Sequence, residues 1–236
     1  MKKVILFMAM IAATISGVAQ TVEEKPEVKG QTSESLAAVK LANQILRYGY
    51  ENKSTLALLD ALQIFSENPT QAFNATKQGE NVDESKNDGK KANVSFDYDS
   101  VLADAKKFAD GDPNLLALID NIDAEAKGAQ RGNINGPSRD YAAVNGNSYM
   151  DYTASFVANQ LAEVLVSGDG DTDLDLYVYD SNGNPIASDT DYSDDCYVRW
   201  VPAWTGRYTI RIVNRGPVYN RCLLYTSPSP RDMRRS

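Results

Sequence analysis

The sequence predicts an α+β fold in two parts, a small helical bundle followed by an antiparallel β-sandwich. In the first half, apolar residues recur at the spacing of amphipathic helices. From Asp151 onward, apolar and polar residues alternate in short runs separated by turn residues, which is typical of strands with one buried face. The clearest run spans 168–180, where Leu174, Leu176 and Val178 would face a core.

The start of the chain has the pattern of a cleaved secretory signal. Lys2 and Lys3 precede an apolar run at 4–15, and small residues lead to Ala19. This run is shorter than the ~20 residues that a membrane span needs, and no other stretch is long and apolar enough to cross a bilayer. We therefore expect a signal peptide at 1–19, cleavage near Ala19, and a secreted or periplasmic protein without a membrane span.

Residues 35–128 are expected to form a helical domain, preceded by a flexible leader at 20–34. Apolar stripes predict a first pair of helices at 35–48 and 54–67, joined by a turn at 49–53. A second pair follows and completes a bundle of four helices. Core packing is the simplest role for these stripes.

Capping and stop signals give the boundaries of the second pair. Asp99 or Ser100 is expected to cap the third helix, and Asp112 to cap the fourth. Gly128 is expected to end the fourth helix. Between the two pairs, the polar insert at 74–93 is expected to be a loop or disordered.

The second half predicts a sandwich over 151–221, after a linker at 129–150 that includes a first edge strand near Tyr141. Glycine, asparagine and serine clusters mark the turns between strands. The predicted strands are Tyr152–Phe156, Leu161–Val166, Leu174–Tyr179, Cys196–Trp200 and Arg207–Val213.

Short motifs in this half carry a family resemblance. They are Asp151-Tyr152, the Asp-Leu-Asp-Leu-Tyr-Val-Tyr-Asp run at 173–180, Asn182-Gly183, and Gly-Arg-Tyr-Thr-Ile at 206–210. Their order resembles the bacterial pre-peptidase C-terminal domain family over roughly 138–221. The resemblance implies a compact, jelly-roll-like β-sandwich attached to secreted enzymes, and some members bind calcium, collagen or polysaccharide. Here a helical segment, not a peptidase domain, precedes the motifs.

The end of the chain has a second resemblance. Residues 222–232 resemble one reading frame of a sequencing adapter. The native fold is then expected to end near Arg221, with 222–236 as an artefactual tail excluded from the fold. A natural last strand with a proline-rich end is the alternative. Cys196 and Cys222 could pair in an oxidising compartment, or Cys196 could be a lone packing residue.

Charge and composition exclude several kinds of site. The net charge is −8, and no basic stripe is present, so nucleic acid is not expected as a partner. The chain has no histidine, which excludes Ser-His-Asp catalysis and histidine-ligated zinc. A metal site would have to use oxygen ligands, which favours calcium or magnesium.

Aspartates are crowded around the run at 168–180 and in the loop that follows the next turn. Alternate residues of a strand share a face about 7 Å apart, so these carboxylates would repel one another unless a cation or hydrogen-bond donors neutralise them. A calcium site is predicted here, and a solvated acidic face is the alternative. The candidate ligands are Asp169, Asp171, Asp173, Asp175, Asp189, Asp191 and Asp194.

Exposed tyrosines are the candidate ligand-binding residues. An aromatic platform could hold sugar rings or an extended peptide, whereas cross-strand packing is the alternative. The candidates are Tyr177, Tyr179, Tyr192 and Tyr197.

The leading functional hypothesis is a secreted, non-catalytic binding or targeting protein. Its calcium-tuned sandwich would hold a surface polysaccharide or an extracellular protein. A second hypothesis is an accessory or inhibitory partner of a secreted enzyme, acting through the helical domain. A third is a small hydrolase that uses two carboxylates as acid and base. The sequence does not specify an oligomeric state.

Overall fold

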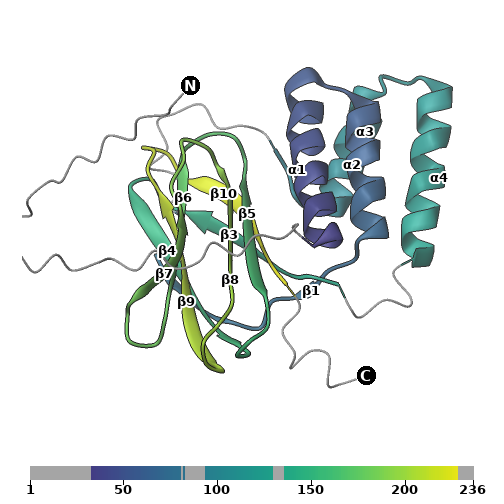
Figure 1. Ribbon diagram of the computed structural model, residues 1–236. Helices are drawn as coiled ribbons and strands as arrows, with labels where there is room; N and C mark the ends of the chain where they lie inside the picture. Colours follow the sequence, from purple (N-terminus) through teal and green to yellow (C-terminus); the bar gives the residue numbers. More distant parts are fainter. Residues whose placement is uncertain (1–32, 81, 83–93, 130–135, 228–236) are drawn as a thin grey trace, which may run out of the picture.

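The computed structural model describes residues 33–80, 82, 94–129 and 136–227. In this part of the chain four helices precede a sandwich of two sheets, which confirms the predicted fold class (Figure 1). The helices are α1 Glu34–Asn52, α2 Thr55–Glu67, α3 Tyr98–Phe108 and α4 Pro113–Ala129.

Each sheet has five strands. Sheet A has the order β1-β3-β10-β5-β8, and sheet B has the order β2-β4-β9-β6-β7. The short β1 runs parallel to β3, and the other neighbours are antiparallel. The strands are β1 Gln71–Ala72, β2 Thr76–Gly79, β3 Ser138–Val144, β4 Ser148–Phe156, β5 Ala162–Gly168, β6 Leu174–Tyr179, β7 Pro185–Asp189, β8 Asp195–Trp200, β9 Gly206–Asn214 and β10 Asn220–Thr226.

The inner faces of the two sheets form the main core. As the alternation predicted, Leu174, Leu176 and Val178 of β6 are fully buried there. Aromatic rings close one end of the sandwich, where Trp200 packs against Phe156 with ring centroids 4.9 Å apart. Edge-to-face packing of this kind adds about 0.5–1.5 kcal/mol beyond the buried area.

The helices cover the outer face of sheet A. Leu36 and Val39 of α1 pack against Leu165 of β5 and against Leu223 and Tyr225 of β10. Every residue of β5 is buried, because that strand has a core on both sides. The helices and the sandwich therefore share a hydrophobic core, and sheet B is the layer farthest from the helices (Figure 1).

Two segments predicted as connections belong to the sheets. The predicted linker contains β3, at the place of the strand expected near Tyr141, and also the start of β4, so strands of the sandwich precede Asp151. The insert predicted as a loop contains β2, which pairs with β4 at Thr76↔Thr153. Its residues are polar and exposed, which suits an edge strand but gives no local strand signal. The insert residues 81 and 83–93 lie outside the described residues.

The expectation that the fold ends near Arg221 is wrong in this structure. Strand β10 runs to Thr226 and pairs with β3 on one side and β5 on the other. Leu224 faces the inner core, and Leu223 and Tyr225 face the helices. The apolar run is buried on both faces, as expected of a central strand. That residues 222–232 resemble an adapter stays a prediction about the sequence, and 228–236 lie outside the described residues.

The two cysteines are free and buried. Cys196 pairs with Val166 and Cys222 pairs with Gly168, so β5 lies between their strands. Two strand spacings amount to roughly 10 Å, beyond the ~7 Å that a disulfide bridges between Cα atoms. Both thiols serve packing, and burial raises the pKa of each.

Some helix boundaries differ from the predicted ones, because close helix packing or a different capping residue decides where the helix begins or ends. The predicted turn at 49–53 is mostly helix, because Gly49 lets α1 and α2 approach closely: a Cβ there would lie 2.6 Å from Leu58 Cδ2. Helix α3 is capped by Asp97, whose carboxylate accepts a hydrogen bond from the Ser100 amide. Asp112 caps α4 as predicted, but α4 continues through Gly128.

Candidate functional site

The outer face of sheet B carries a row of tyrosines around one arginine. We call the set Tyr149, Asp151, Tyr177, Tyr179 and Arg211 the Tyr face. Arg211 stands on β9 opposite Asp151 of β4 and opposite Tyr177 of β6. Because alternate residues of a strand share a face, these neighbouring strands bring the side chains onto one surface. Tyr149 is 48% exposed.

Arg211 is held in place by contacts on several sides. Its Nε and Nη2 atoms each donate to Asp151 at 2.7 Å, a two-point pair of the strong, directional kind. Its guanidinium carbon lies 4.1 Å from the ring centre of Tyr149 and 5.7 Å from that of Tyr179. The hydrogen bonds to Asp151 raise the pKa of Arg211. The cation is therefore rigid and permanently charged.

The two tyrosines of β6 extend the face. Tyr177 and Tyr179 are stacked, with ring centres 6.2 Å apart and planes at 20°. The Tyr177 hydroxyl donates to Asp175 at 3.0 Å and accepts from Arg215 Nη2 at 3.0 Å. Arg215 Nε in turn donates to Asp175 at 2.6 Å. The rings are thus ordered before any ligand arrives, which lowers the entropy cost of binding.

A hollow of about 650 Å³ adjoins the Tyr face, within the range of small-ligand sites. Tyr179 and Arg207 contribute to its wall, and Asp180 lies at the turn after β6. Asp180 is occupied, because it accepts the amides of Asn182 and Asn184 at 2.8 and 2.9 Å. Ring faces next to hydroxyls and fixed charges can stack on a sugar ring and hydrogen-bond its hydroxyls.

The structure brings together only part of the predicted tyrosine platform. Tyr177 and Tyr179 lie side by side, but Tyr192 is 99% exposed in the loop between β7 and β8. Tyr197 belongs to sheet A, where its hydroxyl donates to Glu163 at 2.6 Å beneath α1. Sequence reasoning did not name Tyr149 or Arg211 as binding residues, although the alternation in β4 and β9 places both on the outer face.

The predicted aspartate cluster is divided in two by the fold. One part surrounds Arg47 of α1, which donates to Asp195 through Nη1 at 2.9 Å and also through Nη2. Asp194 lies 4.0 Å from Arg47, and it also accepts the Gly170 amide. Asp169 is buried and accepts the Arg221 amide at 3.0 Å. Arg47 thus pairs with Asp195 and lies near Asp194, and backbone amides donate to Asp194 and Asp169.

The pKa of Asp194 is raised and the pKa of Asp195 is lowered, because burial and Arg47 act on each carboxyl in opposite directions. Burial raises the pKa of Asp194, and Arg47 only partly offsets it. Burial also acts to raise the pKa of Asp195, but the hydrogen bonds and charge of Arg47 outweigh it and lower that pKa. This ion pair ties α1 to β8 at the edge of sheet A.

The other part of the cluster lies near the start of β6. Asp175 is engaged by Arg215, and Asp191 Oδ1 accepts the Ser193 amide at 3.0 Å. Asp189 Oδ2 accepts the Tyr197 amide at 2.8 Å. Asp171 is half-buried in the turn before β6. In the described part of the chain, no group of three or more carboxylate or cysteine side chains is arranged to hold a metal ion.

Asp173 lies directly before β6. Its Oδ1 atom is buried and has no hydrogen-bond partner among the described residues. Burial raises the pKa of Asp173, and the charges of Asp175 and Asp191 add to that effect. A cation bound beside Asp173 would offset the charges of Asp175 and Asp191.

The comparisons with known proteins concern the sandwich. No protein-family model matches the chain, and no curated protein matches it. Among solved structures, the chain is similar to the pre-peptidase C-terminal domain of a Bacillus anthracis collagenase, at 10% identity and a TM-score of 0.32, over 38% of this chain and 88% of that one. Membership of the pre-peptidase C-terminal domain family stays a prediction.

Two further structures show similarities of the same extent. One is a periplasmic inhibitor of g-type lysozyme from Aeromonas hydrophila, with 15% identity, a TM-score of 0.31, and coverage of 39% of this chain and 84% of that one. The other is a carbohydrate-binding module of a Cellvibrio mixtus lichenase in complex with cellotriose, with 9% identity, a TM-score of 0.25, and coverage of 39% and 87%.

Membrane insertion through a helix finds no support in the described residues. None of their helices combines the length and the apolar character that crossing a bilayer requires. The predicted signal peptide lies outside the described residues.

Proposed function

We propose that this protein is a non-catalytic binding protein that holds an extended polysaccharide on the Tyr face. The observation that supports the proposal best is the arrangement of Arg211, pinned by Asp151 and flanked by the rings of Tyr149 and Tyr179. Flat aromatic surface beside fixed hydrogen-bonding groups suits a chain of sugar rings. The Tyr face lies on the sheet that the helices leave uncovered, so a long polymer has access (Figure 1).

The hydrolase alternative is less well supported at this site. A two-carboxylate hydrolase needs one carboxyl group that is protonated and free to donate. The carboxylates beside the hollow are Asp151, which accepts two hydrogen bonds from Arg211, and Asp180, which accepts two backbone amides. Both carboxylates therefore already accept hydrogen bonds from groups of the protein itself.

Replacing Tyr179 by alanine is expected to weaken polysaccharide binding at least tenfold, about 1.4 kcal/mol. The change removes one ring of the stacked pair and one of the two rings beside Arg211. The measurement is affinity electrophoresis in gels that contain soluble cellulose, galactan or pectin, with gelatin as the peptide counterpart.

Tyr48→Ala is the matched control, because Tyr48 is an exposed tyrosine on α1 far from sheet B. It is expected to migrate as the unaltered protein does. Equal retardation of the Tyr179 and Tyr48 variants would count against the Tyr face. Retardation by gelatin alone would indicate that the Tyr face binds a peptide and not a polysaccharide.

Calcium and secretion remain parts of the proposal. We expect millimolar calcium to raise the melting temperature relative to chelator, because a cation near Asp173 would relieve the repulsion from Asp175 and Asp191. Asp173→Asn should abolish the calcium effect, and Asp120→Asn on α4 should retain it. Scanning calorimetry measures both, and identical melting of the unaltered protein in calcium and in chelator would remove calcium from the function.

A further inference from the structure

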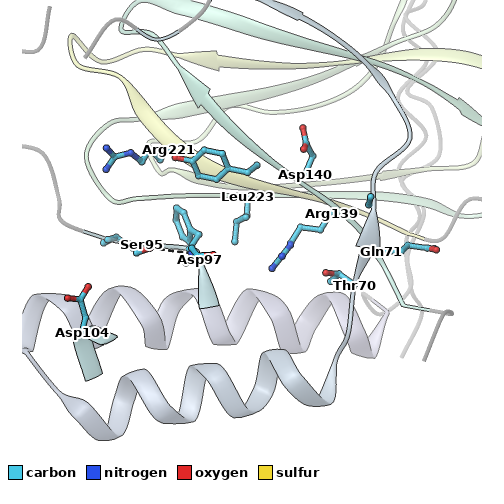
Figure 2. A pocket seen from close by; sticks show the side chains of 13 residues that line it. Thr70, Gln71, Ser95, Asp97, Asp104, Arg139, Asp140, Arg221 and Leu223 are labelled. Carbon is cyan, nitrogen blue, oxygen red and sulfur yellow. Dashed lines mark hydrogen bonds between the residues drawn. The ribbon is translucent and has the colours of Figure 1, made fainter. Parts of the chain in front are cut away.

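A second cavity lies between the helical layer and the outer face of sheet A, away from the Tyr face. Its volume is about 600 Å³, which is within the range of small-molecule sites. Figure 2 shows its walls, with Thr70 before β1 and Gln71 in it, Ser95 and Asp97 before α3, and Arg139 on β3. No part of the proposed function uses this cavity.

Arg139 provides a positioned cation in this cavity. Its backbone is paired on both sides, with Ala72 of β1 and with Tyr225 of β10. Its side chain is exposed, and among the residues that the structure describes it forms no ion pair. A guanidinium on a rigid strand, always charged and with a planar set of donors, is well suited to bind a carboxylate at two points.

The nearby charges of the cavity are engaged elsewhere. The charge of Arg139 acts on Asp97 and contributes to its lowered pKa. The Asp97 carboxylate caps α3, because it accepts hydrogen bonds from the amide and the hydroxyl of Ser100 at 3.0 and 2.8 Å. Asp140 pairs with Lys77 at 3.3 Å. Arg221 extends toward Tyr219, to which it donates at 2.8 Å. Arg139 itself acts on the Tyr225 hydroxyl through a hydrogen bond and its charge, and it forms no ion pair among the described residues, so its other donors can meet an anion.

The far side of the cavity has the opposite character. Asp104 of α3 lies across from Arg139 in Figure 2 and accepts the Tyr50 hydroxyl at 3.1 Å through Oδ2. Leu223 forms apolar floor between the two ends. A matching ligand has a carboxylate at one end, hydrogen-bond donors at the other, and a body with an apolar face. An α-amino acid fits less well, because its ammonium and carboxylate groups are attached to the same carbon atom and cannot reach opposite ends of the cavity.

We propose that this cavity binds a small sugar acid, with the carboxylate on Arg139 and ring hydroxyls toward Asp104. The sugar ring supplies the apolar face over Leu223. The site is independent of the Tyr face, since it lies on the other sheet.

The test is calorimetric titration of the full chain with D-glucuronate. D-glucose is the neutral counterpart, acetate is the carboxylate without a ring, and alanine is the zwitterion. We expect glucuronate to bind at least tenfold more tightly than each of the three. Equal or tighter binding of glucose, acetate or alanine would overturn the sugar-acid assignment.

Variants test the geometry. Arg139→Gln is expected to weaken glucuronate binding at least tenfold, and Arg139→Lys to restore part of it as a point charge. Arg199→Gln, at the opposite edge of the same sheet, is the control and should bind as the unaltered protein does. Unchanged binding by Arg139→Gln would overturn the proposal. If that variant fails to fold, titration of the unaltered protein with glucuronate, glucose, acetate and alanine still tests whether the cavity binds a sugar acid.

The variant Tyr179→Ala separates this site from the Tyr face. It is expected to lose polysaccharide binding and to keep glucuronate binding. Loss of glucuronate binding in Tyr179→Ala, with Arg139→Gln unaffected, would move the sugar acid to sheet B.

Discussion

A chain that ends at Arg221 is expected to lose the folded sandwich. The deletion removes most of β10, the strand between β3 and β5, and turns both neighbours into exposed edges. It also removes the buried side chains of Cys222, Leu223, Leu224 and Tyr225. Each large apolar side chain contributes about 1.5–3 kcal/mol by burial. Their sum is comparable with the whole free energy of unfolding of a domain, which is about 5–15 kcal/mol.

The measurement is near-ultraviolet circular dichroism with a thermal scan. The matched control is a chain that ends at Ser227, which keeps all of β10 and should melt as the full chain does. Leu224→Ala provides a graded version, with an expected loss of about 2–5 kcal/mol. A cooperative transition that survives in the chain ending at Arg221 would show that 222–227 are not part of the fold.

Replacement of Arg47 by methionine is expected to destabilise the protein by about 3 kcal/mol at pH 7. Arg47 and Asp195 are mostly buried, with side chains 19% and 13% exposed. Removing the cation leaves Asp195 and its neighbour Asp194 as buried charges without their arginine. Removal of one partner of a buried ion pair is strongly destabilising, because the remaining charge stays buried and unpaired. Urea unfolding measures the loss.

The destabilisation should depend on pH. Arg47 lowers the pKa of folded Asp195 below the unfolded value of about 3.9, so the pair contributes stability above that pH and loses it as the pH falls through the folded pKa. Without Arg47, burial raises the pKa of Asp195, and stability is then lost as the pH rises. The difference between the two proteins should therefore shrink from pH 7 to pH 3.5.

The control is Lys106→Met. Lys106 pairs with Asp120 on the helix surface, where the side chains are 45% and 69% exposed. Exposed pairs contribute about 0–1 kcal/mol, so this variant should unfold almost as the unaltered protein does. An equal loss in both variants, or one that does not vary with pH, would contradict the buried role of Arg47.

Local patterns predicted much of the β part. The alternation around Leu174 and Ile210 identified β6 and β9 and their buried faces, because a strand with one buried face repeats every second residue. Strand β7, at Pro185–Asp189, was missed, since it is a short edge strand with no fully buried residue. The strands β1 and β2 were missed for a related reason: their pairing comes from neighbours far away in sequence.

The candidate sites were predicted only in part. Tyr177 and Tyr179 were found because they alternate with buried residues within one strand. Arg211 and Arg139 were not, because alternation places a side chain on a face of a sheet but does not show which groups it meets there. Arg211 depends on Asp151 across a strand pair, and Arg139 depends on the helices that close its cavity. The predicted aspartate cluster looked continuous in sequence, but Arg47 from a distant helix takes one part of it.

The sequence by itself determined the four helices, the strands β4, β5, β6, β8 and β9 with their inner faces, and the acidic character of the chain. These follow from short-range periodicity and composition, which need no knowledge of partners. Only the tertiary structure decided which carboxylates meet a cation, that β10 is central, and that the helices cover sheet A and leave sheet B open. Those outcomes depend on contacts between distant segments, and their energies arise only when the layers pack.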